Sequence, residues 1–466
     1  MVSRLTSLMQ NTWRSWSGRR RAISVGVVLI ATVGLGVLAY ELLKRPPDVS
    51  NENIDFVDHE QKEPKTKKPK DTTFDWPTYG FNDQRTRYVP TDKVKPPFDS
   101  SDWSFQAGKL LEFSPVIVRD RIFFMDIDAR FYALDLESGR VDWKTRIGTR
   151  NASAPAAADH KLFGVNLEPG QAFALAPRTG RVIWKTPLPG RSESSPLAFK
   201  DKLVIFGCEC GTVFALDQKD GSIEWTVETS GEIKGALAQG KGNVYGGNYA
   251  GEVFSIDAKT GREEWRISTI GGSFGRGGGV YSTPAVAFGR VYFGSIDSRV
   301  YSVDMDTGEI AWSKSTGAEV YSGPAVADTK TTRPTVYIGS ADDNFYALDA
   351  RTGATRWQQN AGGDVTGAAS VLGDVAYVSV IGDAVGTIGY DIENGKKVYE
   401  HELGEYNPAI TDGERMYLTG YSTLRAFPPE DGKRQGSKRK PKKGERGKQG
   451  DRTPGRTAGS KKPGKG

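Results

Sequence analysis

Two cysteines and three histidines are the first candidates for redox or metal chemistry in this chain of 466 residues. Cys208 and Cys210 flank a glutamate in "CEC", a spacing that would allow an exposed redox pair. Spacing alone is weak evidence, so we favour ordinary small residues at the end of a strand. The histidines lie far apart, at 59, 160 and 401, and none belongs to a CxxC, HExxH or CxxCH motif. The sequence therefore predicts no metal site built from His or Cys and no disulfide framework.

Several aspartates are candidates for calcium binding or for a general base. They lie in or near the predicted turns between strands, where aspartate is also the common turn-forming residue in contact with solvent. We favour the turn-forming interpretation. The residues concerned are Asp126, Asp128, Asp342, Asp343 and Asp383.

Two long connections are candidates for binding. Residues 271–283, "GGSFGRGGGVYST", are rich in glycine but lack the Lys-Ser/Thr ending of a phosphate loop, which argues against a nucleotide site. Residues 328–334 read "DTKTTRP". Long loops on a rigid scaffold often carry binding. Each loop is therefore either a partner contact or a plain connector, and its length is the only signal.

A repeated Asp-x3-Gly-x3-Trp pattern indicates the elements that position these residues. Its glycines recur at steps of 40 to 47 residues, a period typical of a propeller or a similar array. Complete copies begin at Asp135, Asp217, Asp257, Asp304 and Asp349, and degraded copies begin at Ala176 and Asp391.

One unit of the repeat predicts four strands. "FYALD" alternates as a half-buried strand does, aspartate opens the following turn, and glycine supplies the positive φ that closes it. The tryptophan then lies on the next strand, where its ring can fill the gap between neighbouring sheets. Two further short strands precede each "FYALD", which gives the strand content of one propeller blade.

The count of units predicts an eight-bladed ring. An eighth unit begins at residues 407–432 but lacks its tryptophan strand. Trp103 lies 40 residues before Trp143 with no hairpin of its own before it, so this N-terminal strand should complete the last blade. We expect an all-β fold over residues 76–432: an eight-bladed β-propeller of four-stranded antiparallel blades.

The N-terminal region predicts a membrane anchor. Residues 22–40 carry no charge and "RRR" precedes them, so we expect a transmembrane helix over 22–43 and a basic cytoplasmic segment over 1–21. A cleaved signal peptide is the alternative, although the apolar run is longer than usual for one. Residues 44–75 should be a disordered linker, and residues 433–466 a disordered basic tail.

The repeats resemble the pyrroloquinoline-quinone (PQQ) repeat over about residues 76–432. Eight blades with this signature are shared by the quinoprotein dehydrogenases, which hold PQQ and calcium in a central funnel, and by the cofactor-free propeller subunit of the outer-membrane β-barrel assembly machinery. Residues 75–88, "DWPTYGFNDQRTRY", also resemble the segment that opens many quinoproteins. The resemblance is specific for the fold and says little about function.

The tryptophans argue against a bound quinone. Trp13 and Trp16 precede the apolar run, and Trp76 leads into the repeats. The other seven occupy the structural position of the repeat, so none remains to stack on a planar cofactor: they are Trp103, Trp143, Trp184, Trp225, Trp265, Trp312 and Trp357. The chain also lacks the vicinal cysteines of the dehydrogenases and any haem motif. We therefore expect no enzyme, no cofactor, and no catalytic, cofactor-binding or metal residue.

The function that we expect is a protein-binding scaffold in the cell envelope, anchored in the inner or plasma membrane with the propeller outside the cytoplasm. The assembly-machinery subunit is a lipoprotein, whereas this chain has no cysteine after its apolar run, so the helix would be the anchor. A PQQ-dependent dehydrogenase acting on alcohols or sugars is one alternative. A tether to a cell-wall polymer or to anionic lipid headgroups through residues 433–466 is another.

Overall fold

The computed structural model describes residues 46–58, 75–98, 100–200, 202–271, 278–382 and 386–428, together with Thr32. The chain divides into two units, Met1–Glu430 and Asp431–Gly466, and all described residues belong to the first. The expected membrane helix at 22–43 (apart from Thr32), Asp383 and the basic tail lie outside the described residues. Within the described ranges, no helix combines the length and the apolar character needed to cross a bilayer.

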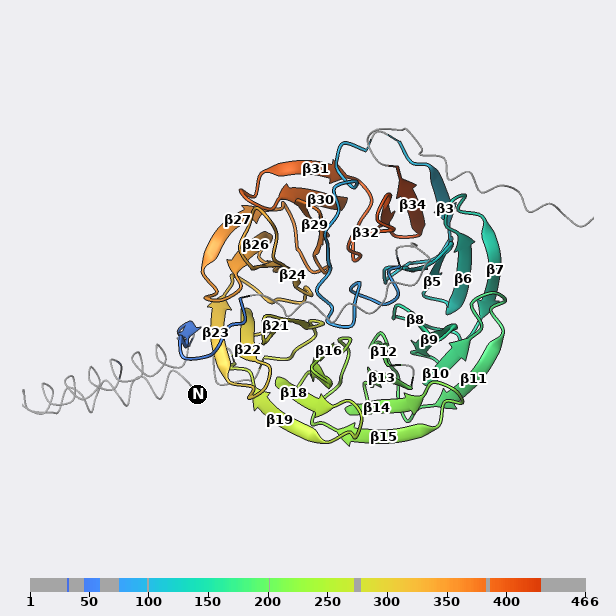
Figure 1. The fold of residues 1–466 in the computed structure, drawn as a ribbon, viewed down its shortest axis with the longest axis horizontal. Coiled ribbons are helices and arrows are strands. Elements are labelled where there is room, and N and C mark those ends of the chain that lie inside the picture. The colour runs from blue at the N-terminus through green and yellow to red at the C-terminus, as the bar shows by residue number, and fades with distance from the viewer. Residues whose placement is uncertain are drawn as a thin grey trace, which may run out of the picture. The chain divides into compact units, whose positions relative to one another are not determined.

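Eight antiparallel sheets form a ring, as the repeat predicts, and Figure 1 shows them side by side around a common centre. Blades 1 and 2 comprise β4 (Val116–Val118), β5 (Arg121–Met125), β6 (Arg130–Asp135), β7 (Val141–Arg146), β8 (Ala156–Ala158), β9 (Lys161–Asn166), β10 (Gln171–Leu175) and β11 (Val182–Pro187). Blades 3 and 4 comprise β12 (Leu197–Phe199), β13 (Leu203–Gly207), β14 (Thr212–Asp217), β15 (Ile223–Glu228), β16 (Ala238–Gly240), β17 (Asn243–Gly247), β18 (Glu252–Asp257) and β19 (Glu263–Ser268).

The second half of the ring repeats this arrangement. Blades 5 and 6 comprise β20 (Ala285–Ala287), β21 (Arg290–Ser295), β22 (Arg299–Asp304), β23 (Ile310–Ser315), β24 (Ala325–Ala327), β25 (Thr335–Gly339), β26 (Asn344–Asp349) and β27 (Thr355–Asn360). Blade 7 comprises β28 (Ser370–Leu372), β29 (Val375–Val380), β30 (Gly386–Asp391) and β31 (Lys397–His401), and blade 8 contains β32 (Ile410–Thr411), β33 (Met416–Thr419) and β34 (Thr423–Phe427).

An N-terminal strand closes the ring. β3 (Trp103–Gln106) pairs antiparallel with β34, with Trp103 opposite Ala426 and Gln106 opposite Thr423. Blade 8 therefore has the order β3-β34-β33-β32, in which the outermost strand comes from the start of the propeller. The prediction from the isolated Trp103 is confirmed, and β3 covers the edge of β34 that would otherwise be unpaired.

The Asp, Gly and Trp of each repeat form the turn and the contact between blades that the sequence predicts. In blade 6, the Asp349 carboxylate accepts hydrogen bonds from the Arg351 and Thr352 amides, and Gly353 closes the turn at φ +73°. The Trp312 ring of blade 5 covers this glycine, and its indole N–H donates to the Ala350 carbonyl at 3.0 Å. The same pair of contacts joins all seven propeller tryptophans to the next blade. The covered glycines are Gly139, Gly180, Gly221, Gly261, Gly308, Gly353 and Gly395.

Residues 75–89, which we call the plug, cross the centre of the ring as the blue segment in Figure 1. Their peptide groups hydrogen-bond to the inner strands of blades 1, 2, 4, 5, 6 and 7 at 2.8–2.9 Å. β2 (Tyr88–Val89) ends the plug as a fifth strand parallel to β28. The pairs are Trp76 with Ile117, Pro77 with Ala157, Asp83 with Gln239, Gln84 with Val286, Thr86 with Val326 and Arg87 with Val371.

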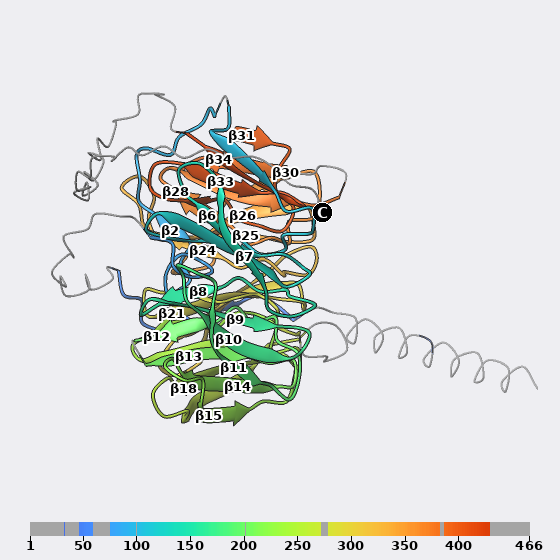
Figure 2. The ribbon, with the colours of Figure 1, turned by 90° about the vertical axis from the view of Figure 1, so that its right-hand side faces the viewer.

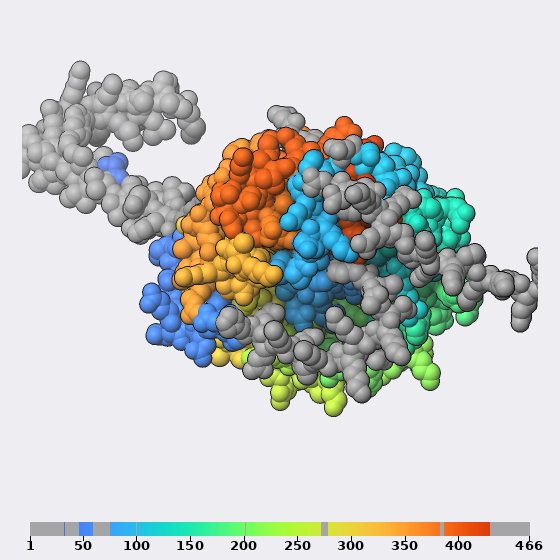
Figure 3. Space-filling model, turned by 45° about the horizontal axis from the view of Figure 1, so that its top comes forward, coloured from blue at the N-terminus to red at the C-terminus, as the bar shows by residue number. Residues whose placement is uncertain are grey.

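Residues 46–58, which we call the strap, lie on the outer edge of blade 5, seen as the darker blue atoms beside the yellow blade in Figure 3. β1 (Val49–Ser50) pairs antiparallel with β23, and Asp48 forms an ion pair of 3.2 Å with the buried Arg299. Phe56 stacks on Phe288 at 5.3 Å between ring centroids. The expectation of a disordered linker over 44–75 is therefore wrong at 46–58, because two buried arginines and an aromatic surface of blade 5 supply partners that composition does not reveal.

Candidate functional site

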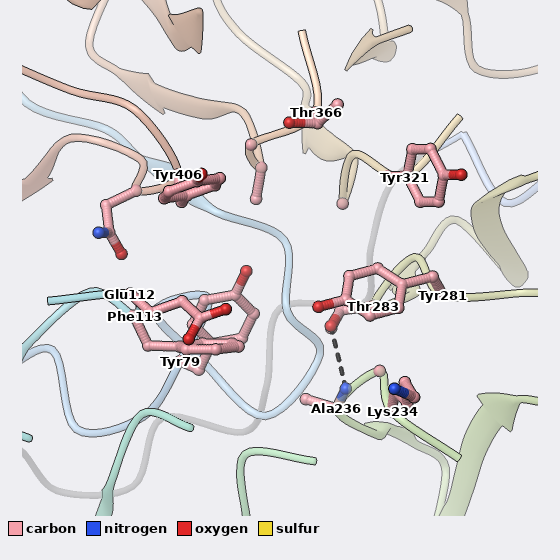
Figure 4. Close-up of a pocket in the computed structure, with 15 residues that line it drawn as sticks. Tyr79, Glu112, Phe113, Lys234, Ala236, Tyr281, Thr283, Tyr321, Thr366 and Tyr406 are labelled. Carbon is pink, nitrogen blue, oxygen red and sulfur yellow. Dashed lines mark hydrogen bonds between the residues drawn. The ribbon is translucent and has the colours of Figure 1, made fainter. Parts of the chain in front are cut away.

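A cavity of about 220 Å³ lies at the centre of the ring, on one side of the plug. Its walls come from the connections that lead from the outer strand of one blade to the inner strand of the next (Figure 4). Six of these connections contribute: β3–β4, β15–β16, β19–β20, β23–β24, β27–β28 and β31–β32. Figure 2 shows the ring of blades from the side.

The plug forms the floor of the cavity through Tyr79. The Arg87 guanidinium lies 5.2 Å from the centroid of the Tyr79 ring and donates to the carbonyls of Arg85 and Pro324. Arg85 is fully buried and donates to Leu237 O at 3.0 Å, to Pro196 O at 3.1 Å and to the Tyr79 carbonyl. Burial lowers the pKa of Arg85 to about 9, which still leaves it charged at neutral pH. Two buried guanidinium groups therefore hold the floor by hydrogen bonds to carbonyls.

Hydrogen bonds between neighbouring connections fix the walls. The Ser282 hydroxyl donates to Ser322 O and the Ser322 hydroxyl donates to Gly367 O, both at 2.8 Å. Asn407 donates to Leu111 O at 2.8 Å and so ties the β31–β32 connection to the backbone beside Glu112. These groups are buried, where an unmade hydrogen bond is costly, so the wall is held in one arrangement.

Charged side chains lie on two sides of the cavity. Lys234 is surrounded by carboxylates, with Glu193 at 3.5 Å, Glu232 at 3.8 Å and Glu209 at 3.9 Å. Burial, with a hydrogen bond to Glu209, raises the pKa of Glu193 to about 7, and Lys234 opposes the rise. Burial also raises the pKa of Glu112, on the other side. One carboxylic group that lines the cavity, Glu112, and one beside it, Glu193, therefore have pKa values above those of exposed glutamates.

Tyrosines surround the mouth of the cavity. Tyr249, Tyr281 and Tyr321 follow one another at 6.1 Å between ring centroids, with nearly perpendicular ring planes. Tyr249, Tyr406 and Tyr421 are 38%, 44% and 61% exposed. Tyr421 joins this surface because its carbonyl accepts from the Leu111 amide, next to Glu112. We call these five residues the tyrosine rim.

Cys208 and Cys210 form a disulfide in the turn between β13 and β14. Their Cα atoms lie 5.0 Å apart, within the usual range for disulfides. The interpretation as ordinary residues is wrong, because this turn brings residues two apart close enough to bond. Glu209 between them is 6% exposed and accepts hydrogen bonds from Arg191 at 3.0 and 2.6 Å. The bond closes a very short loop, so it restricts the unfolded chain little.

The predicted acidic candidates that the structure describes serve as turn residues. Asp126 accepts from the Arg130 amide at 2.9 Å and from the Tyr132 hydroxyl at 3.0 Å. Asp342 accepts from the Tyr346 hydroxyl at 2.6 Å and from the Asn344 amide. Asp128 pairs with Lys109, and Asp343 occupies a turn position at φ +66°. In the described part of the chain, no three His, Cys, Asp or Glu side chains gather to hold a metal ion.

The two candidate loops lie at opposite ends of the blades, and one of them reaches the cavity. Residues 272–277 of the glycine-rich connection lie outside the described residues, but its last residues, Tyr281 and Thr283, line the cavity. Residues 328–334 form the turn between β24 and β25, at the opposite end of the blade. Only the first loop therefore contributes to the site.

Sequence reasoning missed the main residues of the site, which are Tyr79, Glu112, Lys234, Tyr281 and Tyr406. A usable signal was present for two of them, because Glu112 and Tyr281 lie two residues before the "SP" or "TP" that precedes an inner strand. Those connections converge on the axis in every propeller of this topology.

The quinone and calcium that the resemblance implies do not fit the described residues. No tryptophan lines the cavity, since all seven propeller tryptophans pack between blades. The volume of about 220 Å³ is below the roughly 300 Å³ at which sites for drug-sized ligands begin. We therefore derive no reaction step through a quinone.

Comparison with known families decides the classification. The sequence model described as outer membrane protein assembly factor BamB matches residues 168–332 and 296–458, which together span more than half of the chain. The chain belongs to the BamB family. No curated protein sequence matches this BamB-family chain.

Solved structures show the same fold. BamB from Moraxella catarrhalis is 19% identical, with a TM-score of 0.59 over 71% of this chain and 99% of that chain. The quinohemoprotein alcohol dehydrogenase from Comamonas testosteroni is 14% identical, with a TM-score of 0.62 over 76% of this chain and 80% of that chain. A europium-containing methanol dehydrogenase is 15% identical, with a TM-score of 0.63 over 76% and 98%. At these identities the likeness concerns the fold alone.

Proposed function

We propose that this BamB-family chain is a non-enzymatic, protein-binding scaffold of the cell envelope, anchored in the membrane by residues 22–43 with the propeller outside the cytoplasm. The observation that carries the binding role is the tyrosine rim, which presents partly exposed aromatic rings on hairpin turns and on connections, beside a cavity wall held by buried hydrogen bonds. Tyrosine is enriched at protein interfaces and among the residues that dominate binding energy.

The absence of catalysis is supported by the structural roles of the tryptophans and of the candidate aspartates. The seven propeller tryptophans fill the contacts between blades, and the candidate aspartates Asp126 and Asp342 bond to turn amides and tyrosine hydroxyls. The likeness in fold to dehydrogenases favours the alternative function, a PQQ-dependent dehydrogenase. Mixing the purified protein with PQQ and calcium separates the two: we expect no quinone spectrum and no dye reduction by alcohols or sugars. Turnover would overturn the proposal.

The binding face is tested by cross-linking from two positions. A photoreactive residue replacing Tyr406 on the tyrosine rim should give a discrete cross-linked product in membranes. The same residue replacing Ile223, which is 50% exposed on β15 at the outer edge of blade 3, is the matched control. Equal products from both positions, or a product from Ile223 alone, would contradict binding at the rim.

The anchor and its orientation are supported by the charge pattern and by the strap. Residues 22–40 are uncharged after "RRR", and the contacts of the strap with blade 5 begin at Pro46. If residues 22–43 span the bilayer, only residues 44 and 45 separate the span from the propeller. A reporter enzyme that works only outside the cytoplasm, fused after residue 428, should be active, and fusion after residue 21 should leave it inactive. Activity of both fusions or of neither would contradict the orientation.

A further inference from the structure

The Glu112 carboxylate is the unused charge of the central cavity. It points into the cavity from the β3–β4 connection in Figure 4. Among the described residues it makes no hydrogen bond and no ion pair, although Asn407 holds the neighbouring Leu111 carbonyl in place. Arg150 favours the charged form of Glu112 from a longer distance, but this arginine already pairs with Glu168 at 3.8 Å. A partly buried carboxylate without a direct partner is unfavourable, and a cation beside it would relieve that cost.

Lys234 does not neutralise this carboxylate. Its ammonium group lies among Glu193, Glu209 and Glu232 and 5.5 Å from the centroid of the Tyr249 ring. Figure 4 shows Lys234 and Glu112 on opposite sides of the cavity. Next to the cavity, the contact of Lys234 with Tyr249 is an example of an ammonium group that packs against a tyrosine ring with carboxylates around it.

The walls next to Glu112 are aromatic. Tyr79 forms the floor, and Tyr281, Tyr321 and Tyr406 line the sides. The hydroxyl groups of Tyr79 and Tyr281 point into the cavity in Figure 4. Burial raises the pKa of Tyr281, so its phenol stays neutral. Tyrosine ring faces attract cations, and hydroxyl oxygens accept hydrogen bonds from ammonium groups.

We propose that the cavity binds a primary alkylammonium group, with Glu112 as the counter-ion and the rings of Tyr79 and Tyr281 as the walls. The volume of about 220 Å³ equals that of roughly seven water molecules, which suits a linear aliphatic amine of a few carbons. The group could belong to a free amine or to a lysine side chain of a polypeptide. This site goes beyond the proposed scaffold function and does not require it.

Calorimetry on the full-length protein in detergent tests the site. The probes are n-butylammonium chloride and n-butanol, which have the same chain length but differ in charge. We expect n-butylammonium to bind at least tenfold more tightly than n-butanol. Equal affinities, or no binding of either probe, would overturn the proposal without using any variant and without reference to a protein partner.

Variants then test which residues bind the ammonium group. Glu112→Gln should weaken n-butylammonium binding at least tenfold, and Tyr281→Leu should weaken it several-fold. Glu137→Gln, on an exposed turn of blade 1, is the control and should bind like the parent. If Glu112→Gln fails to fold, Glu112→Asp replaces it and should weaken binding by retracting the carboxylate. Unchanged binding in a folded Glu112 variant would refute the assignment.

A peptide pair identifies the source of the amine. The peptide acetyl-Gly-Gly-Lys-Gly-Gly-amide is compared with the same peptide carrying acetyl-lysine. Binding of the lysine peptide tenfold more tightly than n-butylammonium assigns the site to a polypeptide lysine. Weaker binding of the peptide than of n-butylammonium assigns it to a free amine. Equal binding of both peptides would contradict recognition of the charge.

Discussion

The contact between a tryptophan and a glycine is the smallest unit of this fold. The Trp312 ring lies so close to Gly353 that a Cβ atom there would be 2.8 Å from it. Gly108 has the same φ of +73° but no atom within 4 Å of the corresponding position. The two glycines therefore separate the cost of a positive φ from the cost of a clash.

Gly353→Ala should be clearly more destabilising than Gly108→Ala. Positive φ alone costs about 1 kcal/mol for alanine, which is the loss that we expect at Gly108. At Gly353 the displaced indole ring should bring the loss to roughly 3 kcal/mol. Urea unfolding of both variants measures the difference. Equal losses would show that the ring does not restrict this position.

Glu193 should give the protein a pH-dependent stability. Its pKa is raised from 4.5 to about 7 in the folded state, so the folded chain binds more protons than the unfolded chain between these values. The free energy of unfolding should therefore fall as pH rises from about 4.5 to 7 and then level off.

Glu193→Gln should remove this dependence and make the protein about 1–3 kcal/mol more stable than the parent at pH 8. Lys234 keeps Glu209 and Glu232 as partners in the variant. Denaturant unfolding at pH 5 and pH 8 measures the slope, with Glu137→Gln as the control. A variant with the slope of the parent would show that Glu193 titrates normally.

At the scale of elements, the plug depends on a guanidinium that joins two blades. Arg85 reaches Pro196 of the β11–β12 connection and Leu237 of the β15–β16 connection. A lysine carries the same charge but cannot donate in several fixed directions at once. Arg85→Lys should therefore cost about 2–4 kcal/mol by leaving buried carbonyls unpaired. Arg140→Lys, on an exposed turn, should be neutral in the same thermal unfolding assay, and a matching loss there would refute the account.

The strap depends on an ion pair with a buried arginine. Asp48 pairs with Arg299, whose side chain is only 2% exposed. Asp48→Ala should cost about 1–3 kcal/mol, because it leaves a buried cation without its carboxylate. The control is Asp306→Ala, which breaks an exposed pair with Lys241 and should cost less than about 0.5 kcal/mol. Limited proteolysis should also cleave near residue 50 faster in the Asp48 variant. An unchanged cleavage rate would show that the ion pair does not hold the strap on blade 5.

At the scale of the whole molecule, the strand that closes the ring is β3. Trp103 on β3 and Trp184 on β11 are matched residues, with 8% and 7% exposure and indole hydrogen bonds of 3.1 Å. Each alanine substitution should cost about 3–5 kcal/mol. Only the loss of Trp103 should also open the ring, since the strand that carries it comes from the other end of the propeller.

Hydrogen exchange distinguishes these two effects. In Trp103→Ala, the amides of β34 should exchange through a partial opening before the other blades do. In Trp184→Ala, all blades should exchange together through global unfolding. The same exchange pattern in both variants would show that β3 is not a weak point of the closure.

The sequence by itself determined the blades, their number and the closing strand, because each depends on local patterns. Asp349, Gly353 and Trp357 lie within one turn and its two strands, so their spacing reports the turn directly. Trp103 could be matched to a vacancy at the other end of the chain by counting. The same counting could not place residues 46–58, whose partners, Arg299 and Phe288, lie more than 200 residues away.

Only the tertiary structure decided the cavity and its chemistry. Glu112, Tyr281 and Tyr406 come from three connections separated by more than 100 residues each, and nothing in their local sequence marks them as neighbours. They meet because a closed ring brings every connection to one axis, where the plug supplies Tyr79 as a floor. A local repeat specifies its own turn, whereas a site built from six connections between blades exists only once the ring has closed.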